Sequence, residues 1–581
     1  MIQPCPSRVT GLLCLFVFGA GGSLAGGNPP GFVFRESAAQ RGVEGYVMAP
    51  GFGGGVCAAD FDNDGDIDLF LPTSEGAPNL LFRNRGDGVF DEIAAQVGLA
   101  STDRARVALW IDYDGDGLLD LLVGGDCRSM TPDNCLGSGL RLYRQSTDGS
   151  FVDVTTQSGV GALGPMLNNN IHRGGLAAGD LNADGFLDVV QCLWGGGGVS
   201  IFLNTGAGEF VDATADSGVG SPFEDAWQPV LLDVDHDGDL DFYTSIDFGP
   251  NHLWINDGSA HFLDAAPRAH VDTAFNDMGI AVGDADNDGE LDLYISEINE
   301  GELHNVLHHR LPGANPAYEE IAVDAGVADA SFAWGDTWFD ADNDGFLDLA
   351  VTNGWFNGPG VSDQSRFFRN TGADPVLFED VSGAVGFNDT LWGSSLAGAD
   401  LDGDGDVDLV QTTTNQGPVR VLENIRANKA AAAHWLVIRP RTAGSNRFAI
   451  GAEVRAVVGE QTMTRRIAAG GGYLAQEPAE ADFGLGDREF VDRVEITWPS
   501  GEATTLFAVP SDQKLTIEKG ACCAIADLDF NGVVDASDLT TLLSAWGPCV
   551  SVCQGDFNHD GVVNGVDLAT LLTGWGPALI K

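Results

Sequence analysis

Basic residues are scarce in this sequence. Lysine and arginine together number 29, against 85 aspartates and glutamates, which gives a formal net charge of −56. A surface this acidic repels nucleic acid and anionic membranes, so we expect neither as a partner.

Long apolar runs and catalytic signatures are also missing. After residue 25 no stretch approaches the roughly 18 uninterrupted apolar residues of a membrane-spanning helix, so we expect no membrane insertion. The chain has no Gly-x-Ser-x-Gly elbow, no His-Glu-x-x-His motif and no phosphate-binding P-loop. The apolar content of 44% excludes wholesale disorder, so the chain is expected to fold.

The first 25 residues have the pattern of a secretory signal peptide. Arg8 precedes an apolar core over residues 12–18, and Ser23-Leu24-Ala25 offers a small-residue cleavage site. We therefore expect a secreted or cell-surface protein, extracellular or periplasmic.

Cysteine is sparse for the length of the chain. Cys5 and Cys14 lie in the signal segment, which leaves eight of the ten cysteines in an oxidising compartment. Cys127 and Cys135 bracket a short loop and are candidates for a local disulfide. Cys57 and Cys192 fit either buried thiols or a pair. Four more cysteines flank a C-terminal loop and allow three pairings: Cys522, Cys523, Cys549 and Cys553.

One acidic sequence motif, here also called the acidic phrase, recurs seven times. Its first copy is the run from Asp60 to Asp68, DFDNDGDID. The ligands of such a loop are the carboxylates at positions 1, 3, 5 and 9 and the backbone carbonyl of position 7, while the glycine at position 6 allows the chain to bend. Because all of these ligands are oxygens, they suit a hard cation, and we expect calcium. The candidate ligands are Asp60, Asp62, Asp64 and Asp68; Asp112, Asp114, Asp116 and Asp120; Asp180, Asn182, Asp184 and Asp188; Asp233, Asp235, Asp237 and Asp241; Asp284, Asp286, Asp288 and Asp292; Asp340, Asp342, Asp344 and Asp348; Asp400, Asp402, Asp404 and Asp408.

The spacing of these loops indicates repeated sheets. Successive copies begin 52, 68, 53, 51, 56 and 60 residues apart, a period that holds one four-stranded antiparallel sheet. Six copies are followed by a Phe- or Tyr-led strand that ends near Gly-Val, whereas the last copy is not. An N-terminal segment of this kind, residues 32–43, precedes the first loop. We predict that it supplies the outer strand of the last sheet and closes a seven-bladed β-propeller over residues 30–426.

These loops and strands resemble the FG-GAP/VCBS repeats of integrin α-subunit propellers. The resemblance implies that each calcium loop joins the first two strands of a blade. Only the third loop departs from four aspartates, with Asn182 at position 3.

Residues 432–519 lack the acidic phrase and contain short alternating strands. We expect strands at 434–440, 452–458, 462–468, 491–498 and 514–518, forming a small β-sandwich. Residues 445–447, 472–476, 483–486 and 498–501 resemble elements of the ASPIC/UnbV domain, although Asp482 stands where a histidine is expected. Repeats followed by this domain are the arrangement of the family that includes cartilage acidic protein.

The C-terminal segment, 522–577, carries two further acidic loops, each followed by a candidate amphipathic helix. The duplicated loop and helix resemble a dockerin, which implies a cohesin-like or cell-surface partner. We expect these loops to raise the complement to about nine calcium ions. Their candidate ligands are Asp527, Asp529, Asn531, Asp535 and Asp538 in the first loop, and Asp556, Asn558, Asp560, Asn564 and Asp567 in the second.

Large side chains recur at the ends of the inner strands opposite the calcium loops, where a propeller channel opens. A protein or carbohydrate ligand and simple channel packing are both consistent with such residues. The candidates are Arg106, His172, Arg173, Trp227, Trp334 and Trp392. The adjacent pair His308 and His309 is expected in a solvated connection.

The sequence thus predicts a secreted, mainly β, calcium-binding protein that acts in adhesion or ligand binding without enzymatic activity. The competing class is a carbohydrate-active enzyme such as a polysaccharide lyase. Its acid and base would come from Arg106, His172 and Arg173.

Overall fold

The computed structural model describes most of the chain in twelve long segments and several short C-terminal ones. They are residues 31–48, 53–74, 76–125, 139–162, 172–220, 224–298, 304–313, 315–328, 332–355, 358–414, 417–426, 433–520, 526, 528, 533–548, 555–557, 561–573 and 575–577. The signal segment and the cysteines at 127, 135, 522, 523, 549 and 553 lie outside the described residues.

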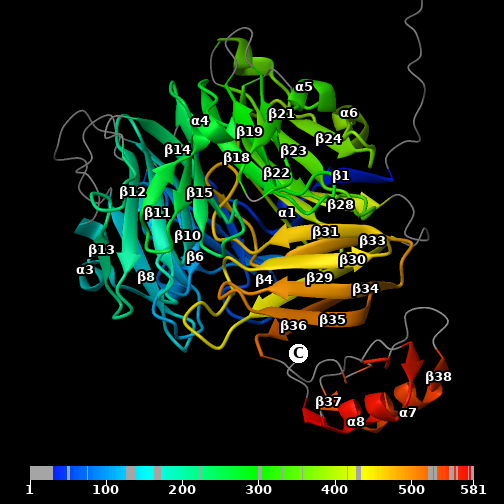
Figure 1. Cartoon of the computed structure of the whole chain (residues 1–581). Helices are drawn as coiled ribbons and strands as arrows, with labels where there is room; N and C mark the ends of the chain where they lie inside the picture. Colours follow the sequence, from blue (N-terminus) through cyan, green and yellow to red (C-terminus); the bar gives the residue numbers. More distant parts are fainter. Residues whose placement is uncertain are drawn as a thin grey trace, which may run out of the picture.

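The fold is mainly β and consists largely of repeated antiparallel sheets, consistent with a propeller (Figure 1). Within the described residues, seven sheets share one strand pattern, from an inner to an outer strand. The first three are β2 (Val56–Ala59), β3 (Asp68–Leu71), β4 (Leu80–Asn84), β5 (Phe90–Glu92); β6 (Ala105–Ile111), β7 (Asp120–Gly125), β8 (Leu140–Gln145), β9 (Phe151–Asp153); and β10 (His172–Gly179), β11 (Asp188–Trp194), β12 (Gly198–Asn204), β13 (Phe210–Asp212).

The next three sheets repeat this order. They are β14 (Asp225–Leu232), β15 (Asp241–Asp247), β16 (His252–Asn256), β17 (Phe262–Asp264); β18 (Asp277–Gly283), β19 (Asp292–Glu297), β20 (Val306–Arg310), β21 (Tyr318–Glu320); and β22 (Ala333–Phe339), β23 (Asp348–Asn353), β24 (Arg366–Asn370), β25 (Phe378–Asp380).

The N-terminal strand completes the last sheet, as predicted. This sheet contains β26 (Gly393–Ala399), β27 (Asp408–Thr413) and β28 (Arg420–Arg426), and β1 (Phe32–Glu36) pairs antiparallel with β28. Phe34 packs against Phe339, Phe367 and Phe387 of the neighbouring region. Each inner strand also lies against the next, and β26 lies against β2, so the inner strands form a closed cycle.

The outer strands are shorter than the sequence predicts. Each holds three residues, except for the five-residue β1, and most are followed by a one-turn helix that ends at a residue with positive φ, usually glycine. A glycine there adopts this backbone without steric cost and turns the chain toward the next inner strand. The short helices are α1 (Ala38–Arg41), α2 (Ala94–Val97), α3 (Thr155–Ser158), α4 (Ala266–Ala269), α5 (Ala322–Ala325) and α6 (Ser382–Val385), with 3-10 turns η2 (Val160–Ala162) and η3 (Gly358–Ser362).

Residues 434–518 form two sheets that pack face to face. The first has the order β33 (Ala481–Gly486), β29 (His434–Arg441), β36 (Gln513–Glu518). The second has the order β31 (Gln461–Arg466), β30 (Glu453–Val458), β34 (Phe490–Thr497), β35 (Ala503–Pro510). The sequence missed β33 and β35 but placed the other five strands to within about two residues.

This sandwich lies against the acidic loops of the repeat sheets. Arg439 Nη1 donates to Gly65 O (2.9 Å), Gln461 Nε2 donates to Gly345 O (3.1 Å), and Lys514 Nζ lies 3.2 Å from Asp400 Oδ2. Figure 1 shows the sandwich, in yellow and orange, beside the repeat sheets.

From the sandwich, residues 469–477, here called the channel segment, enter the space between the inner strands. Its short strand β32 (Ala475–Gln476) pairs parallel with β2. Backbone or side-chain hydrogen bonds connect the segment to the other six inner strands. They join Trp110 to Gln476, Ala178 to Ala469, Gln228 to Leu474, Ile280 to Gly472, and Thr337 and Gly398 to Glu477.

The C-terminal segment holds two helices with short flanking strands. They are β37 (Val533–Val534), α7 (Ala536–Ser544), β38 (Gly547–Pro548), β39 (Val562–Val563), α8 (Gly565–Thr573) and β40 (Gly576–Pro577). Leu542 and Leu571 are buried between them, whereas Trp546 and Trp575 are about half exposed. None of the helices in the described part of the chain is long and apolar enough to span a bilayer.

Candidate calcium centres and the channel residues

Each acidic loop begins where an inner strand ends. Position 1 directly follows the inner strand, as Asp60 follows β2, and position 9 is the first residue of the second strand, as Asp68 begins β3. All seven propeller-type loops have this placement, so the position expected from the family resemblance is confirmed.

The position-6 glycine closes each of these loops. Its φ lies between 84° and 101° in all seven, a conformation that L side chains rarely adopt. Its backbone N–H donates to the position-1 carboxylate over 2.7–3.2 Å, as Gly65 does to Asp60. This bond orients one carboxylate oxygen. In loops one and five the other oxygen has no hydrogen-bond partner, whereas in the remaining five loops it accepts a second backbone N–H.

Several loop oxygens are buried without a hydrogen-bond partner. A buried carboxylate oxygen in this state carries a desolvation cost that a bound cation removes. In loops one, two, four and five, three aspartates also place one oxygen each within 4.8 Å of one another; in loop five these are Asp284, Asp286 and Asp288. The chemistry and spacing of these donors fit calcium. The unpartnered atoms are Asp60 Oδ1, Asp62 Oδ1, Asp114 Oδ1, Asp235 Oδ1, Asp284 Oδ1 and Asp342 Oδ1.

Burial strongly disfavours the ionised form of the position-9 aspartates. It raises the pKa of Asp68 to about 9 and the pKa of Asp120, Asp188 and Asp241 to about 8, with neighbouring loop carboxylates adding to the effect. A divalent cation at these loops would hold the carboxylates ionised at neutral pH.

The acidic loops also connect neighbouring sheets, a role that the sequence reasoning missed. A residue at or near the end of the third strand donates its backbone N–H to the position-9 aspartate, and its side chain donates to the position-2 carbonyl of the preceding sheet's loop. For Asn370 these bonds are 2.8 Å to Asp348 Oδ1 and 2.7 Å to Ala285 O. We call this side chain the inter-sheet clasp. The seven clasps, each 2.7–3.1 Å, are Asn84 to Leu401, Gln145 to Phe61, Asn204 to Tyr113, Asn256 to Leu181, Arg310 to Val234, Asn370 to Ala285 and Asn424 to Ala341.

The bond from Asn84 to Leu401 joins the first sheet to the last, so the clasps form a closed cycle. The recurrence of asparagine near the end of five of the seven third strands was the available sequence signal. Its partner carbonyl lies in another repeat, which no local pattern identifies.

The C-terminal loops repeat the same local chemistry where they are described. Gly561 N donates to Asp556 Oδ2 (2.9 Å), as the glycines of the seven loops do. Asp538 accepts from the N–H groups of Leu528 and Asp535 at 2.6 and 2.7 Å, and Asp567 makes the equivalent bonds at 2.8 Å. The predicted ligands Asp527, Asp529, Asn531, Asn558 and Asp560 lie outside the described residues.

Five of the six candidate ligand-face residues lie within the first three residues of inner strands, and Trp392 lies just before one, so all are at the strand ends opposite the acidic loops, as predicted. Trp227 and Trp334 are fully buried, and each packs edge-on against Tyr473 of the channel segment, with centroids 5.7 and 5.4 Å away. Arg106 Nη2 donates to Tyr473 Oη over 3.2 Å.

Two other residues of this set also make internal hydrogen bonds. Arg173 Nε donates to Gly125 O (2.9 Å), and Trp392 Nε1 donates to Val361 O (3.1 Å) while its side chain stays half-buried. His172 begins β10, and its side chain lies outside the described residues. Channel packing therefore accounts for Arg106, Arg173, Trp227 and Trp334 in this structure.

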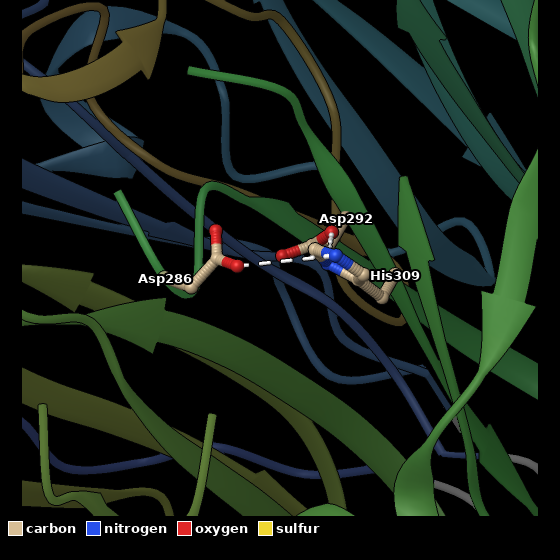
Figure 2. Close-up of side chains that lie close together, drawn as sticks. All are labelled: Asp286, Asp292 and His309. Carbon is tan, nitrogen blue, oxygen red and sulfur yellow. Dashed lines mark hydrogen bonds and ion pairs between the residues drawn. The ribbon is translucent and has the colours of Figure 1, made fainter. Parts of the chain in front are cut away.

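The expectation for the histidine pair is wrong, because both residues lie in strand β20. His308 is 1% exposed, and burial lowers its pKa to about 4, so the ring is neutral. His309 contacts the fifth acidic loop: its Nδ1 lies 3.1 Å from Asp292 Oδ1 and its Nε2 lies 3.9 Å from Asp286 Oδ2 (Figure 2). The hydrogen bond with Asp292 raises the pKa of His309 to about 9.

Cys57 and Cys192 are buried free thiols. Of the two alternatives that the sequence left open, the structure shows buried thiols and not a disulfide pair. Cys57 Sγ donates to Ala108 O over 2.9 Å, and burial raises the pKa of both thiols.

Comparison with known families identifies two kinds of unit. Residues 60–123, 180–244 and 233–295 match the family model of the FG-GAP-like repeat, and residues 442–523 match that of ASPIC and UnbV. The chain therefore contains FG-GAP-like repeats and an ASPIC/UnbV domain, in that order.

Among individual proteins, the chain is homologous to cartilage acidic protein 1. It is 25% identical to the Mus musculus protein over 490 residues, which covers 80% of this chain and 73% of the mouse protein. It is 24% identical to the Homo sapiens protein over 480 residues, 80% of this chain and 62% of the human protein. With the Xenopus tropicalis protein it shares 29% identity over 271 residues, 46% of this chain and 40% of the frog protein.

Solved structures show weaker similarity. One, titled for recognition of non-reducing terminal N-acetylglucosamine by an Agrocybe aegerita lectin, is 18% identical with a TM-score of 0.38, over 63% of this chain and 93% of that one. Another, BBS1N in complex with ARL6DN, is 11% identical with a TM-score of 0.41, over 66% of this chain and 96% of that one.

Proposed function

We propose that this protein is a secreted, calcium-loaded, seven-bladed propeller that acts as a non-enzymatic binding or adhesion protein, with a dockerin-like attachment tail. The observation that carries the calcium part is the recurrence of buried carboxylate oxygens without partners in the acidic loops. In the absence of metal these loops would keep several carboxylates close together, and calcium relieves that repulsion.

The channel supports a binding role over a catalytic one. A polysaccharide lyase would need a free acid and base in one cleft. Here the guanidinium of Arg106 contacts Tyr473 and that of Arg173 contacts a backbone carbonyl. These side chains are engaged inside the protein, so the alternative enzyme has weaker support.

The sandwich covers the loop side, and the channel segment fills the channel. A protein or carbohydrate ligand would therefore meet the repeat sheets on the face opposite the loops, where Trp392 remains half-buried. Aromatic side chains of this kind contribute strongly to protein and sugar recognition. The tail would supply a second contact, with a cohesin-like or cell-surface partner.

A binding screen tests this proposal. The mature chain is applied to glycan and surface-protein arrays in calcium and in chelator, and glycan cleavage is measured separately. We expect binding that needs calcium, that falls at least about tenfold in Trp392→Ala and that persists in Trp546→Ala, which removes a more exposed indole from the tail. Turnover of an acidic glycan, abolished by Arg106→Ala with binding retained, would overturn the non-enzymatic function.

A further inference from the structure

One position in each repeat sheet carries a side chain that differs strongly among the seven copies. It is the residue immediately before the inter-sheet clasp, near the end of the third strand. Arg144 and Arg369 at this position reach carboxylates of their own loops, at 2.6 Å from Asp114 and 3.7 Å from Asp342. In chain order the residues are Arg83, Arg144, Leu203, Ile255, His309, Arg369 and Glu423.

The fifth sheet is the only one of the seven with a nitrogen donor that binds metal in its neutral form at this position. The imidazole of His309 faces two loop carboxylates, Asp286 and Asp292 (Figure 2). One donor atom from each of the three residues lies within 4.8 Å of the others. Two donors that share one ion with bonds of about 2.0–2.2 Å lie at most about 4.4 Å apart, so a small inward movement of these side chains would complete the site.

The three candidate ligands are held by neighbouring backbone. Asp292 Oδ2 accepts from Ala285 N at 3.1 Å, and its Oδ1 accepts from Arg310 N at 2.8 Å. Asp286 Oδ1 accepts from Asp288 N at 3.2 Å. The strand that carries His309 is held at the adjacent residue, because the Arg310 side chain donates hydrogen bonds to Val234 O and Gly313 O. Hydrogen bonds of this kind orient the side chains that contact the metal and strengthen metal binding.

We propose that the fifth acidic loop is a mixed nitrogen–oxygen centre for a divalent transition metal such as zinc, bound by Asp286, Asp292 and His309. The reason is donor chemistry: imidazole suits zinc, cobalt and nickel, whereas calcium takes oxygen ligands almost exclusively. The other loops have no histidine at this position and are oxygen sites for calcium. The inference rests on the proposal that these loops bind cations, but it assigns one loop a different metal.

Cobalt(II) is a suitable probe because its absorption reports nitrogen and oxygen coordination. The full mature chain, made without a histidine tag, is stripped with chelator, saturated with calcium and titrated with cobalt or zinc. We expect one equivalent of transition metal per chain to bind despite excess calcium. His309→Ile, which copies the fourth sheet's Ile255, should weaken that binding at least about tenfold.

Two further variants make the assignment specific. Ile255→His, in the fourth sheet, should create a second mixed centre and raise the stoichiometry to two. His434→Ala removes a histidine that pairs with Asp512 in the sandwich and should change nothing. Absence of a calcium-resistant equivalent in the unsubstituted chain, or equal binding in His309→Ile, would refute the mixed centre. Because calcium binding is measured in the same samples, failure of all the loops to take calcium would instead refute the proposed function.

Discussion

Among single residues, the inter-sheet clasps connect the acidic loops to the closure of the ring. Asn370 is 1% exposed, and its side-chain amide donates to Ala285 O and Leu347 O while its Oδ1 accepts from Gly372 N. Removing the amide leaves two buried carbonyls unpaired, one in each of two neighbouring sheets.

We predict that Asn370→Ala lowers the free energy of unfolding by about 1–3 kcal/mol, the cost of unpaired buried polar groups. The measurement is calorimetric or denaturant unfolding in saturating calcium. Asn388→Ala, an exposed asparagine in the same repeat, is the matched control and should have little effect. Equal loss in both variants would show that the clasp contributes no more than a surface amide.

A second prediction concerns buried acids away from the acidic loops. Asp277 and Glu297 are opposite one another on β18 and β19, and both are fully buried. Burial raises the pKa of Asp277 to about 7 and the pKa of Glu297 to about 8. Their folded pKa values exceed the unfolded ones, so their contribution to stability is lost as the pH rises from about 4 through 8.

Glu297→Gln should therefore raise the melting temperature at pH 8.5 and leave it nearly unchanged at pH 5, where the native acid is already neutral. Thermal unfolding at the two pH values, in calcium, checks this. Glu319→Gln, on the exposed edge of the same sheet, should show no such pH dependence. A destabilised Glu297→Gln protein at pH 8.5 would contradict the prediction.

At this scale the sequence located the acidic loops but missed their buried partners. The aspartates and glycine of a loop lie within nine residues, so their spacing alone predicts a site. The clasp partners Asn84 and Leu401 are 317 residues apart, and their pairing depends on closure of the ring. His309 was misassigned for a similar reason, because its strand register determines which loop it reaches.

Among the elements, the channel segment makes contacts with the inner strands that the sequence did not predict. Its glycine- and tyrosine-containing motif supported the ASPIC/UnbV resemblance, but nothing in it indicated insertion between seven inner strands. Gly472 has φ +56°, and a Cβ there would lie 2.9 Å from Asp336 O, so the close approach requires glycine. The tryptophans predicted at the channel meet Tyr473 of the same chain.

We predict that Tyr473→Ala destabilises the protein by about 3–5 kcal/mol, as large-to-small core changes do. The expected readouts are a lower melting temperature and a loss of near-ultraviolet dichroism from Trp227 and Trp334. Tyr473→Phe keeps the ring contacts and loses the hydrogen bond from Arg106, so it should cost about 0.5–1.5 kcal/mol. If Tyr473→Ala behaved like Tyr473→Phe, the aromatic contacts would not contribute as described.

The predicted strands also show where sequence patterns fail to identify an element. Five sandwich strands were predicted from alternating apolar residues, whereas β33 and β35 were missed. β33 contains two glycines, and β35 is only partly buried, so neither shows clear alternation. The outer strands of the repeats are shorter than predicted because their later residues turn into helices.

For the whole molecule, closure of the ring depends on the N-terminal strand. Pairing of β1 with β28 leaves no unpaired edge on β28, and such edges promote aggregation. We predict that a chain lacking residues 1–37 has a lower melting temperature and aggregates, as measured by calorimetry and light scattering. A chain lacking residues 521–581 should keep the melting temperature of the remaining body; unchanged behaviour of the N-terminal deletion would contradict the closure.

The acidic loops also connect the two β domains. Lys514 and Arg439 of the sandwich reach loop residues Asp400 and Gly65, so metal bound in the loops would support both the sheets and the interface. Each site with calcium at about ten times its dissociation constant contributes about 1.4 kcal/mol, and several sites together rival the stability of a domain.

The most direct test of this account is thermal unfolding of the mature chain in millimolar calcium and after chelation, with limited proteolysis in parallel. The account predicts a marked fall in melting temperature on chelation, rapid cleavage within the acidic loops, and recovery of both properties when calcium is restored. An unchanged melting temperature and unchanged protease resistance after verified removal of metal would contradict it.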